Sequence, residues 1–264
     1  MRYWLILALG VCSGCWALLP ASTPMTSTRD YYEHGPARCL VIFLPGVKDV
    51  AEDFQKHGFI EAIRKRGLSV DVVSADASLA YYTSGEFLER FGNDVVRPAR
   101  ARGYEQTWLM GLSLGGRGSL LYAHAHPEEI TGVLALSPYM GNRMLTKEIH
   151  AAGGLAQWHA PEKLTSRATS DGAYQRELWR WLQAITAGTE KGPVLYLGWG
   201  TSDYWLGESL GLIGNALPKD RVFPVDGGHK WTTWEKAMDK FLDESDFARQ
   251  CGSDLRSTQN TQTE

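Results

Sequence analysis

The sequence predicts an α/β fold with a mostly parallel, doubly wound sheet and helices flanking both of its faces. Short apolar runs alternate along the chain with longer segments of helical period. Within each run most residues are apolar, and apolar and polar positions do not alternate. This pattern is typical of strands that helices cover on both faces. They span residues 39–44, 69–74, 107–111, 132–137, 194–199 and 222–225.

Helical segments lie between these runs and provide the connections. They cover residues 51–66, 85–102, 114–126, 206–216 and 232–247. Parallel strands need a crossover of this length, and a helix is its usual form. We expect residues 37–250 to form one domain, because a chain of 264 residues with 44% apolar side chains suffices for one large core.

One long segment interrupts the alternation. Residues 139–192 contain no strand-like run and carry Trp158, Trp179 and Trp181. They follow the run that ends near residue 137, so an insertion here would lie above the carboxyl ends of the strands. We therefore predict a helical cap over the site, and a helical element packed at the periphery is the alternative.

The first residues are typical of an export leader. Met1 and Arg2 precede an apolar run, residues 3–11, that is too short to span a membrane. Residues 1–19 are therefore predicted to be a signal or lipoprotein leader. Small residues before Cys15 resemble a bacterial lipoprotein processing site, which makes Cys15 the candidate for lipidation. The expected location is the periplasm or the outer membrane, with a lipid anchor, and secretion after ordinary cleavage is the alternative.

The segments that flank the domain are polar. Residues 20–36 begin with a stretch rich in Pro, Ser and Thr and are predicted to form a tether, and residues 251–264 are predicted to be a disordered tail. Two cysteines lie outside the leader, Cys39 and Cys251. In an oxidising compartment a disulfide between them and two buried thiols are equal alternatives, and the sequence does not decide between them.

Residues 111–115, with the sequence Gly-Leu-Ser-Leu-Gly, fit the G-x-S-x-G pattern of a nucleophile elbow. A strand-like run comes directly before the motif and a helical segment directly after it, as the motif requires. Small flanking residues allow the sharp turn that raises the hydroxyl of Ser113 above the sheet. Ser113 is therefore the predicted nucleophile, and a serine that only caps the helix is the alternative.

A serine hydroxyl needs a base to take its proton and an acid to orient that base. His229 lies in a glycine-rich loop after the last strand-like run. Asp203 follows the preceding run through a tight turn, so we expect it at the same sheet edge as Ser113. Asp226 is the competing acid, but it lies only three residues before His229 and fits a role in shaping that loop.

The oxyanion of a tetrahedral intermediate needs hydrogen-bond donors. The amide of Leu114, directly after the nucleophile, is the first predicted donor. The second is Val47, with Gly46 as the second choice, in the loop after the first strand-like run, where Pro45 has no N–H. Two tryptophans flank the predicted acid and base and are the candidates for contacting substrate: Trp205 and Trp231.

Residues 39–247 resemble the α/β-hydrolase superfamily in the elbow, in the His loop and in the chain order of nucleophile, acid and base. The His loop, residues 227–231 with Trp234, is similar to that of the branch known as putative esterases. Members of that branch include carboxylic-ester hydrolases and some acyltransferases. Pro45 departs from the pattern, because many members carry His at this position.

The resemblance implies a serine esterase that cleaves small-molecule esters through an acyl-enzyme on Ser113, with neither a metal nor an organic cofactor. An acyltransferase with the same triad and a non-catalytic binding protein with this fold are the alternatives. A nucleic-acid partner is not expected, because the formal net charge is −3 and no run of Lys or Arg occurs.

Overall fold

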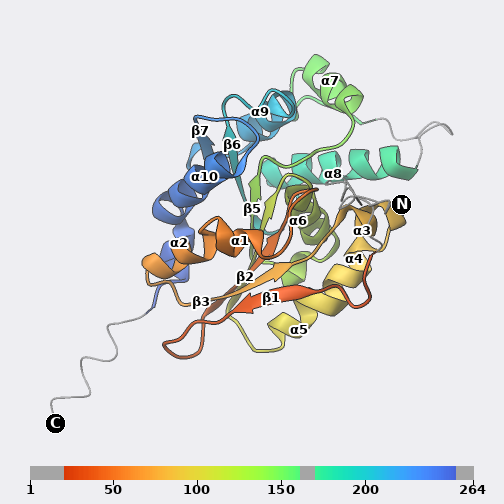
Figure 1. The fold of residues 1–264 in the computed structure, drawn as a ribbon. Helices are drawn as coiled ribbons and strands as arrows, with labels where there is room; N and C mark the ends of the chain where they lie inside the picture. Colours follow the sequence, from red (N-terminus) through yellow and green to blue (C-terminus); the bar gives the residue numbers. More distant parts are fainter. Residues whose placement is uncertain (1–20, 161–169, 254–264) are drawn as a thin grey trace, which may run out of the picture.

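The computed structural model describes residues 21–160 and 170–253, which form an α/β arrangement around a single sheet (Figure 1). The sheet has seven strands in the order β1-β3-β2-β4-β5-β6-β7. Only the pair β1 and β3 is antiparallel, and every other neighbouring pair is parallel. The predicted fold class is therefore confirmed. The strands are β1 (Ser27–Asp30), β2 (Cys39–Leu44), β3 (Val70–Ala75), β4 (Gln106–Leu112), β5 (Gly132–Leu136), β6 (Val194–Gly200) and β7 (Val222–Val225).

Helices cover both faces of this sheet. The first face carries α1 (Asp53–Lys56), α2 (Phe59–Lys65), α10 (Trp231–Glu244) and α11 (Asp246–Gln250). The second face carries α3 (Leu79–Ser84), α4 (Phe87–Arg90), a π-helical turn (Phe91–Val96), α5 (Arg97–Arg100), α6 (Leu114–Ala125), α7 (Arg143–Ala151), α8 (Ser170–Thr186) and α9 (Gly207–Ala216). Two 3₁₀ turns follow α6 and α9, at Pro127–Glu129 and Lys219–Arg221.

The central strand β2 shows why the apolar runs are continuous. All six of its residues are buried. Leu40, Ile42 and Leu44 pack into the core on one face of the sheet, whereas Val41 and Phe43 pack into the core on the other. Successive side chains of a strand point to opposite faces, so a strand that is covered twice needs apolar residues at every position.

Glycine breaks one of the predicted helices. The segment 51–66 was expected as a single helix, but the structure has two, α1 and α2. Gly58 lies between them with φ +75°, a left-handed conformation that glycine adopts without steric cost. The chain therefore turns at Gly58, and both short helices lay their phenylalanines on the sheet.

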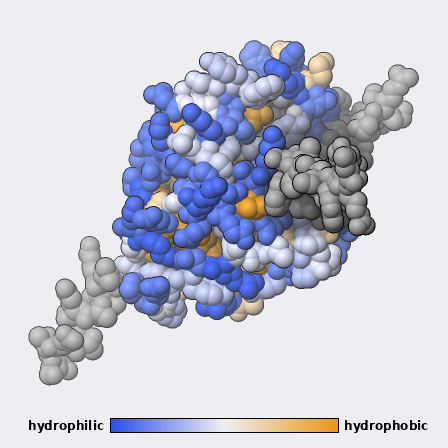
Figure 2. All heavy atoms as spheres, viewed as in Figure 1, coloured by the Kyte–Doolittle hydropathy of each residue, from blue (hydrophilic) through white to orange (hydrophobic). Residues whose placement is uncertain are grey.

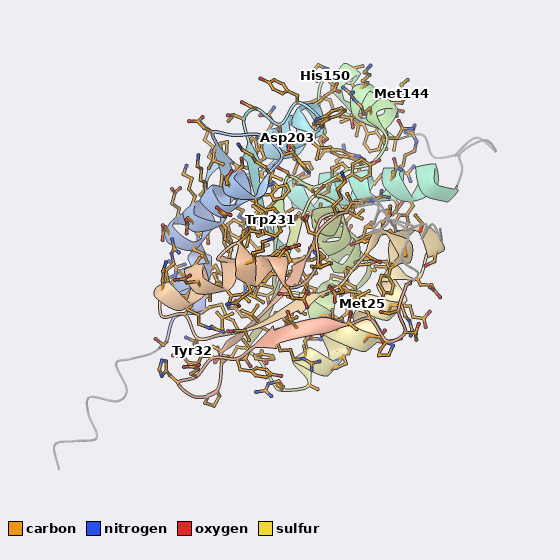
Figure 3. All side chains as sticks on the ribbon, viewed as in Figure 1. Met25, Tyr32, Met144, His150, Asp203 and Trp231 are labelled. Carbon is orange, nitrogen blue, oxygen red and sulfur yellow. A yellow bond between two sulfur atoms is a disulfide. The ribbon has the colours of Figure 1, made fainter. Side chains whose placement is uncertain are left out.

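The predicted tether, residues 20–36, is corrected in part by the structure. Residues 27–30 form β1, which pairs with β3 at the edge of the sheet, and Met25 is buried (Figures 1 and 3). Arg64 of α2 binds the carboxylate of Asp30. The sequence Ser-Thr-Arg-Asp carries no apolar pattern, because backbone hydrogen bonds to β3 hold this edge strand instead of buried side chains.

The first residue of the predicted tail is also fixed. Cys251 is buried and forms a disulfide with Cys39 at a Cα–Cα distance of 5.6 Å. The carbonyl of Cys251 accepts a hydrogen bond from the amide of Ser69 at 2.7 Å. Of the two alternatives left open by the sequence, the structure has the disulfide, which ties the end of the chain to the start of β2.

In the described part of the segment predicted as a cap, residues 139–160 and 170–192, two helices occupy different places. α8 buries Trp179, Trp181 and Leu182 in the core on the second face. α7 packs against α9 beside the carboxyl ends of the strands, where Met144 and His150 mark it in Figure 3. Residues 161–169 of this segment, the leader with Cys15 and residues 254–264 lie outside the described residues.

The surface of the described residues is mostly polar on the face shown in Figure 2, where hydrophobic residues occur in small separate areas. Within residues 21–160 and 170–253, no helix combines the length and the apolar composition that crossing a membrane requires. Among the described residues, the buried apolar side chains form two cores, one on each face of the sheet.

The disulfide closes a loop of 212 residues, so its loss should weaken the fold. We expect the variant with both Cys39→Ala and Cys251→Ala to lose about 2–5 kcal/mol of unfolding free energy, because the unfolded chain is no longer constrained. Urea unfolding with and without reductant measures this loss. Reductant should lower the urea midpoint of the wild type and leave that of the double variant unchanged. Equal midpoints for the wild type and the double variant without reductant would contradict the expectation.

Candidate active site

Ser113 lies at the sharp turn between β4 and α6, in an unusual backbone conformation. Its φ is +49° and its ψ is −109°, values that a residue with a side chain rarely adopts. Two backbone hydrogen bonds of 2.9 Å hold it there: its amide donates to the carbonyl of Leu136 at the end of β5, and its carbonyl accepts from the amide of Tyr139. The turn is therefore fixed by the neighbouring strand and the loop that follows it.

The glycines of the motif make the turn possible. A Cβ atom on Gly111 would overlap the carbonyl of Gly115, and a Cβ atom on Gly115 would overlap the carbonyl of Leu44. Because Gly115 has no side chain, the start of α6 packs directly on the backbone at the end of β2. This contact also brings Gly46 beside Ser113: a Cβ atom built on Gly46 would lie 3.7 Å from the Cβ of Ser113.

The two predicted oxyanion donors have different surroundings. Leu114 is the first residue of α6, where the backbone N–H has no partner within the helix. Val47 follows Gly46 in the loop after β2, and its side chain is exposed. The structure places this loop next to Ser113, and the assignment of Val47 rather than Gly46 as the second donor stays a prediction.

Asp203 and His229 form a direct hydrogen bond. The distance from Nδ1 of His229 to a carboxylate oxygen of Asp203 is 2.7 Å. The Asp203 side chain is completely buried, whereas that of His229 is 27% exposed. Asp226, the alternative acid, is exposed to solvent and not bonded to His229. The structure thus brings together the residues predicted as acid and base.

Backbone hydrogen bonds tie the two loops that carry this pair. The amide of Thr201 donates to the carbonyl of Val225 at 2.8 Å, and the amide of Ser202 donates to the carbonyl of Gly227 at 2.9 Å. Gly227 has φ +140° and packs so closely on Thr233 that a Cβ atom would overlap its hydroxyl. The loop after β6 and the loop after β7 therefore keep a fixed spacing.

The charge state of Asp203 follows from its contacts. Burial acts to raise the pKa of Asp203, but the hydrogen bond and charge of His229 and the amide of Leu206 act in the other direction. The net result is a pKa below the ordinary value for an aspartate. An ionised carboxylate only accepts hydrogen bonds, so Nδ1 of His229 carries the hydrogen and Nε2 is left to act as a base.

Ser113 and His229 line the same cavity, which has a volume of about 540 Å³. Trp205 is 79% exposed and Tyr204 is 87% exposed at this cavity. Large aromatic side chains are usually buried in an apolar core, but these two are not. Ser113, Trp205 and His229 are the lining residues predicted from the sequence, and the others were not predicted. The other lining residues come from the segment after β5 and from the loop and helix after β6: Tyr139, Met140, Gly141, Asn142, Arg143, Thr146, Tyr204, Leu206, Glu208 and Ser209.

Trp231 does not line this cavity, which corrects its prediction as a substrate contact. It is the first residue of α10, and its ring stacks on His57 at 4.2 Å between ring centroids. Its Nε1 donates to Asp49 at 3.1 Å. Figure 3 shows Trp231 beside α1 and Asp203 near α9. Helix α10 packs on the first face of the sheet, so its first residue turns toward α1 and α2 and away from the cavity.

Two other features offer less for catalysis. A larger cavity, about 680 Å³, lies between α2 and α10, but its charged residues pair with one another, as Arg66 does with Asp239. His126, Glu128 and Glu129 have potential metal-ligand atoms within 4.8 Å of one another. They follow the far end of α6, a helix of twelve residues, and so lie about 18 Å from Ser113.

The lowered pKa of Asp203 predicts a pH-dependent contribution to stability. The folded state favours the ionised form, so the contribution is complete above the ordinary carboxyl pKa of about 3.9 and disappears as the pH falls through the lower folded pKa. We expect Asp203→Asn to be about 1.5–3 kcal/mol less stable than the wild type at pH 7, with a difference that narrows in acid. Urea unfolding of both proteins across pH 2–7 measures this difference in unfolding free energy. A difference that stays the same at every pH would contradict the prediction.

Comparisons with known proteins give similarities to esterases. Residues 94–209 match the family model described as "Putative esterase", a segment that includes Ser113 and Asp203. No curated protein gives a significant match. An S-formylglutathione hydrolase from Agrobacterium tumefaciens shares the fold with a TM-score of 0.56 and 15% identity, over 88% of this chain and 93% of that one.

Two further solved structures are similar. FphF, a fluorophosphonate-binding serine hydrolase from Staphylococcus aureus, has a TM-score of 0.53 and 13% identity, over 87% of this chain and 100% of its own. Est1E from Butyrivibrio proteoclasticus, with ferulic acid bound, has a TM-score of 0.54 and 16% identity, over 83% of this chain and 95% of its own. Residues 94–209 are thus similar to the putative esterase family, and the chain shares its fold with these solved hydrolases.

Proposed function

We propose that the protein is a serine esterase that hydrolyses carboxylic esters through an acyl-enzyme on Ser113. The observation that carries this proposal is the 2.7 Å hydrogen bond between Asp203 and His229 beside a cavity that Ser113 also lines. A nucleophile, a base and a buried acid in this relation form the set that acyl transfer needs. The esterase family match supports the same reaction class.

The first half of the reaction forms the acyl-enzyme. Nε2 of His229 takes the proton of the Ser113 hydroxyl as its oxygen bonds to the ester carbonyl carbon. The carbonyl becomes an oxyanion, which accepts hydrogen bonds from the amides of Leu114 and Val47. The ionised Asp203 stabilises the imidazolium of His229. The C–O bond to the alcohol then breaks, and the alcohol leaves with the proton from His229.

The second half releases the acid. Water takes the place of the alcohol, and His229 accepts its proton while the water oxygen attacks the acyl carbon. The bond to Ser113 breaks, and the serine oxygen recovers its proton from His229. This cycle needs two things from the fold: a base that keeps one tautomer, and donors that do not move as charge develops.

The cavity favours small esters with an apolar or aromatic part. Its volume of about 540 Å³ lies within the range of small-molecule sites. Tyr139, Tyr204 and Trp205 provide aromatic surface, and Asn142 and Arg143 provide polar groups at the start of α7. Est1E binds ferulic acid, so methyl ferulate belongs in the substrate panel together with p-nitrophenyl esters of different acyl lengths.

Active-site labelling tests the nucleophile. We expect a fluorophosphonate probe to label the wild type on Ser113, and Ser113→Ala to lose the label and about 10⁶-fold in kcat for p-nitrophenyl esters. Asp203→Asn should label much more slowly and lose about 10⁴-fold in kcat, because His229 is no longer held in the needed tautomer. Gel fluorescence and steady-state kinetics measure both effects.

Ser245→Ala is the matched control for the idea that Ser113 is only a helix cap. The hydroxyl of Ser245 accepts a hydrogen bond from the amide of Phe247 at the start of α11. Its loss should cost about 1 kcal/mol of stability and leave labelling and turnover unchanged. If the folded wild type neither labels nor turns over any ester, the proposal fails and a non-catalytic binding protein replaces it.

We also propose that the protein is exported and anchored by a lipid on Cys15. The Cys39–Cys251 disulfide supports an oxidising compartment, because cytosolic thiols are usually kept reduced. In a Gram-negative host we expect the mature chain to begin at Cys15, carry a lipid and sediment with membranes. Cys15→Ala should release it from the membrane fraction. The intact mass of the mature chain and its distribution between membrane and soluble fractions measure these effects. A wild type that carries no lipid and stays in the soluble fraction would contradict the proposed anchor.

A further inference from the structure

The indole of Trp231 connects two loops that the proposed reaction must keep in register. Its Nε1 donates to Oδ1 of Asp49 at 3.1 Å. Trp231 lies two residues after His229, at the start of α10. Asp49 lies in the loop after β2, residues 45–49, which we term the oxyanion loop because it contains the predicted donor Val47. This hydrogen bond therefore joins the His loop to the oxyanion loop.

Asp49 contacts the oxyanion loop at two further points. Its amide donates to the carbonyl of Gly46 at 3.2 Å, which closes a turn over residues 46–49. Its second carboxylate oxygen packs so closely on Gly46 that a Cβ atom there would overlap it. That hypothetical Cβ atom would also lie 3.7 Å from the Cβ of Ser113. Gly46 thus lies beside both the Asp49 carboxylate and the nucleophile.

The Trp231 ring is itself firmly placed. It stacks on His57 with an interplanar angle of 5°, and it makes edge contacts with Phe54 at 5.4 Å and Phe59 at 5.5 Å between ring centroids. It also contacts Trp234, whose ring lies edge-on to His229 at 4.9 Å. An indole packed on this many sides offers a fixed donor, so the position of Asp49 is set relative to His229.

The surroundings of Asp49 make its donors important. Asp49 is half-buried, and burial raises its pKa, while the hydrogen bonds from Trp231 and from the backbone of Gly46 act in the opposite direction. A half-buried carboxylate that loses the donor from Trp231 needs water or another donor in its place. The accessible route is a shift of the turn at residues 46–49 toward solvent, which would carry Gly46 and Val47 away from Ser113.

We propose that Asp49 and Trp231 form a positioning pair that holds the oxyanion loop against Ser113. The proposal rests on the esterase function above, because it assigns the pair a role in the transition state and none in substrate binding. Oxyanion donors act at about 2.7–3.1 Å from the developing charge, and a displacement of about 1 Å costs on the order of 10²-fold in rate. Pro45 has no N–H, so the loop has no donor before Gly46 to replace one that moves.

Three variants of the pair test this role. Trp231→Phe removes the donor and keeps a ring, and Asp49→Ala removes the acceptor. We expect each to lower kcat by about 10–100-fold with KM within about threefold of the wild type. Asp49→Asn retains a carbonyl oxygen that can accept from Trp231, so it should keep kcat within about threefold. A merely structural role would not produce this rescue together with an unchanged KM.

Trp158→Phe provides the matched control. Trp158 Nε1 donates to Glu148 at 3.0 Å, so this variant also removes an indole–carboxylate hydrogen bond, but one outside the cavity of Ser113. It should lower the melting temperature and leave kcat unchanged. Melting curves of all variants show whether a loss of kcat accompanies unfolding at the assay temperature.

Two outcomes separate this inference from the proposed function. In the first, the wild type is labelled and hydrolyses esters, but Trp231→Phe keeps the wild-type kcat or Asp49→Asn loses as much kcat as Asp49→Ala. The positioning pair is then wrong, and the proposed esterase function stands. If the wild type is inactive, the esterase is wrong, and a crystal structure of Trp231→Phe decides the pair. Gly46 should be displaced from Ser113 in that structure, and an unmoved loop would overturn the proposal.

Discussion

The packing of α6 on the backbone at the end of β2 is the constraint on which the site depends. Gly115 makes this contact against the carbonyl of Leu44, where no side chain fits. The contact sets where α6 begins, and therefore where Ser113 turns and where its hydroxyl lies relative to the loop after β2. Because the same loop continues into Gly46 and Asp49, one glycine couples the nucleophile to the predicted oxyanion donors.

The parallel sheet turns this local contact into a site. Ser113, Asp203 and His229 follow β4, β6 and β7, and carboxyl ends of parallel strands meet at one edge. Strand order alone would not bring two side chains within hydrogen-bond distance. The backbone hydrogen bonds between the loops after β6 and β7 hold the two loops at a fixed spacing, at which the side chains of Asp203 and His229 form their hydrogen bond.

The sequence predicted the features that depend on local pattern. The six parallel strands follow from apolar runs, and the position of Ser113 follows from a motif whose glycines are sterically required. It missed β1, because Ser-Thr-Arg-Asp pairs through its backbone alone. It also misplaced the side chain of Trp231, because the direction of a helix's first residue depends on which face of the sheet that helix covers. Asp49 carried no signal, since its partner is 182 residues away.

Asp203 is buried and Asp49 is half-buried, and the pKa values of their carboxyl groups are shifted in opposite directions. Burial raises both, and for Asp203 the partner is an imidazole that can become a cation, so the ionised form prevails. For Asp49 the main donor is a neutral indole, and burial prevails. A full charge on Asp203 stabilises the imidazolium of His229, which suits the proposed role of that residue. For Asp49, the indole of Trp231 supplies a hydrogen bond of fixed direction, which suits the proposed role in positioning the loop.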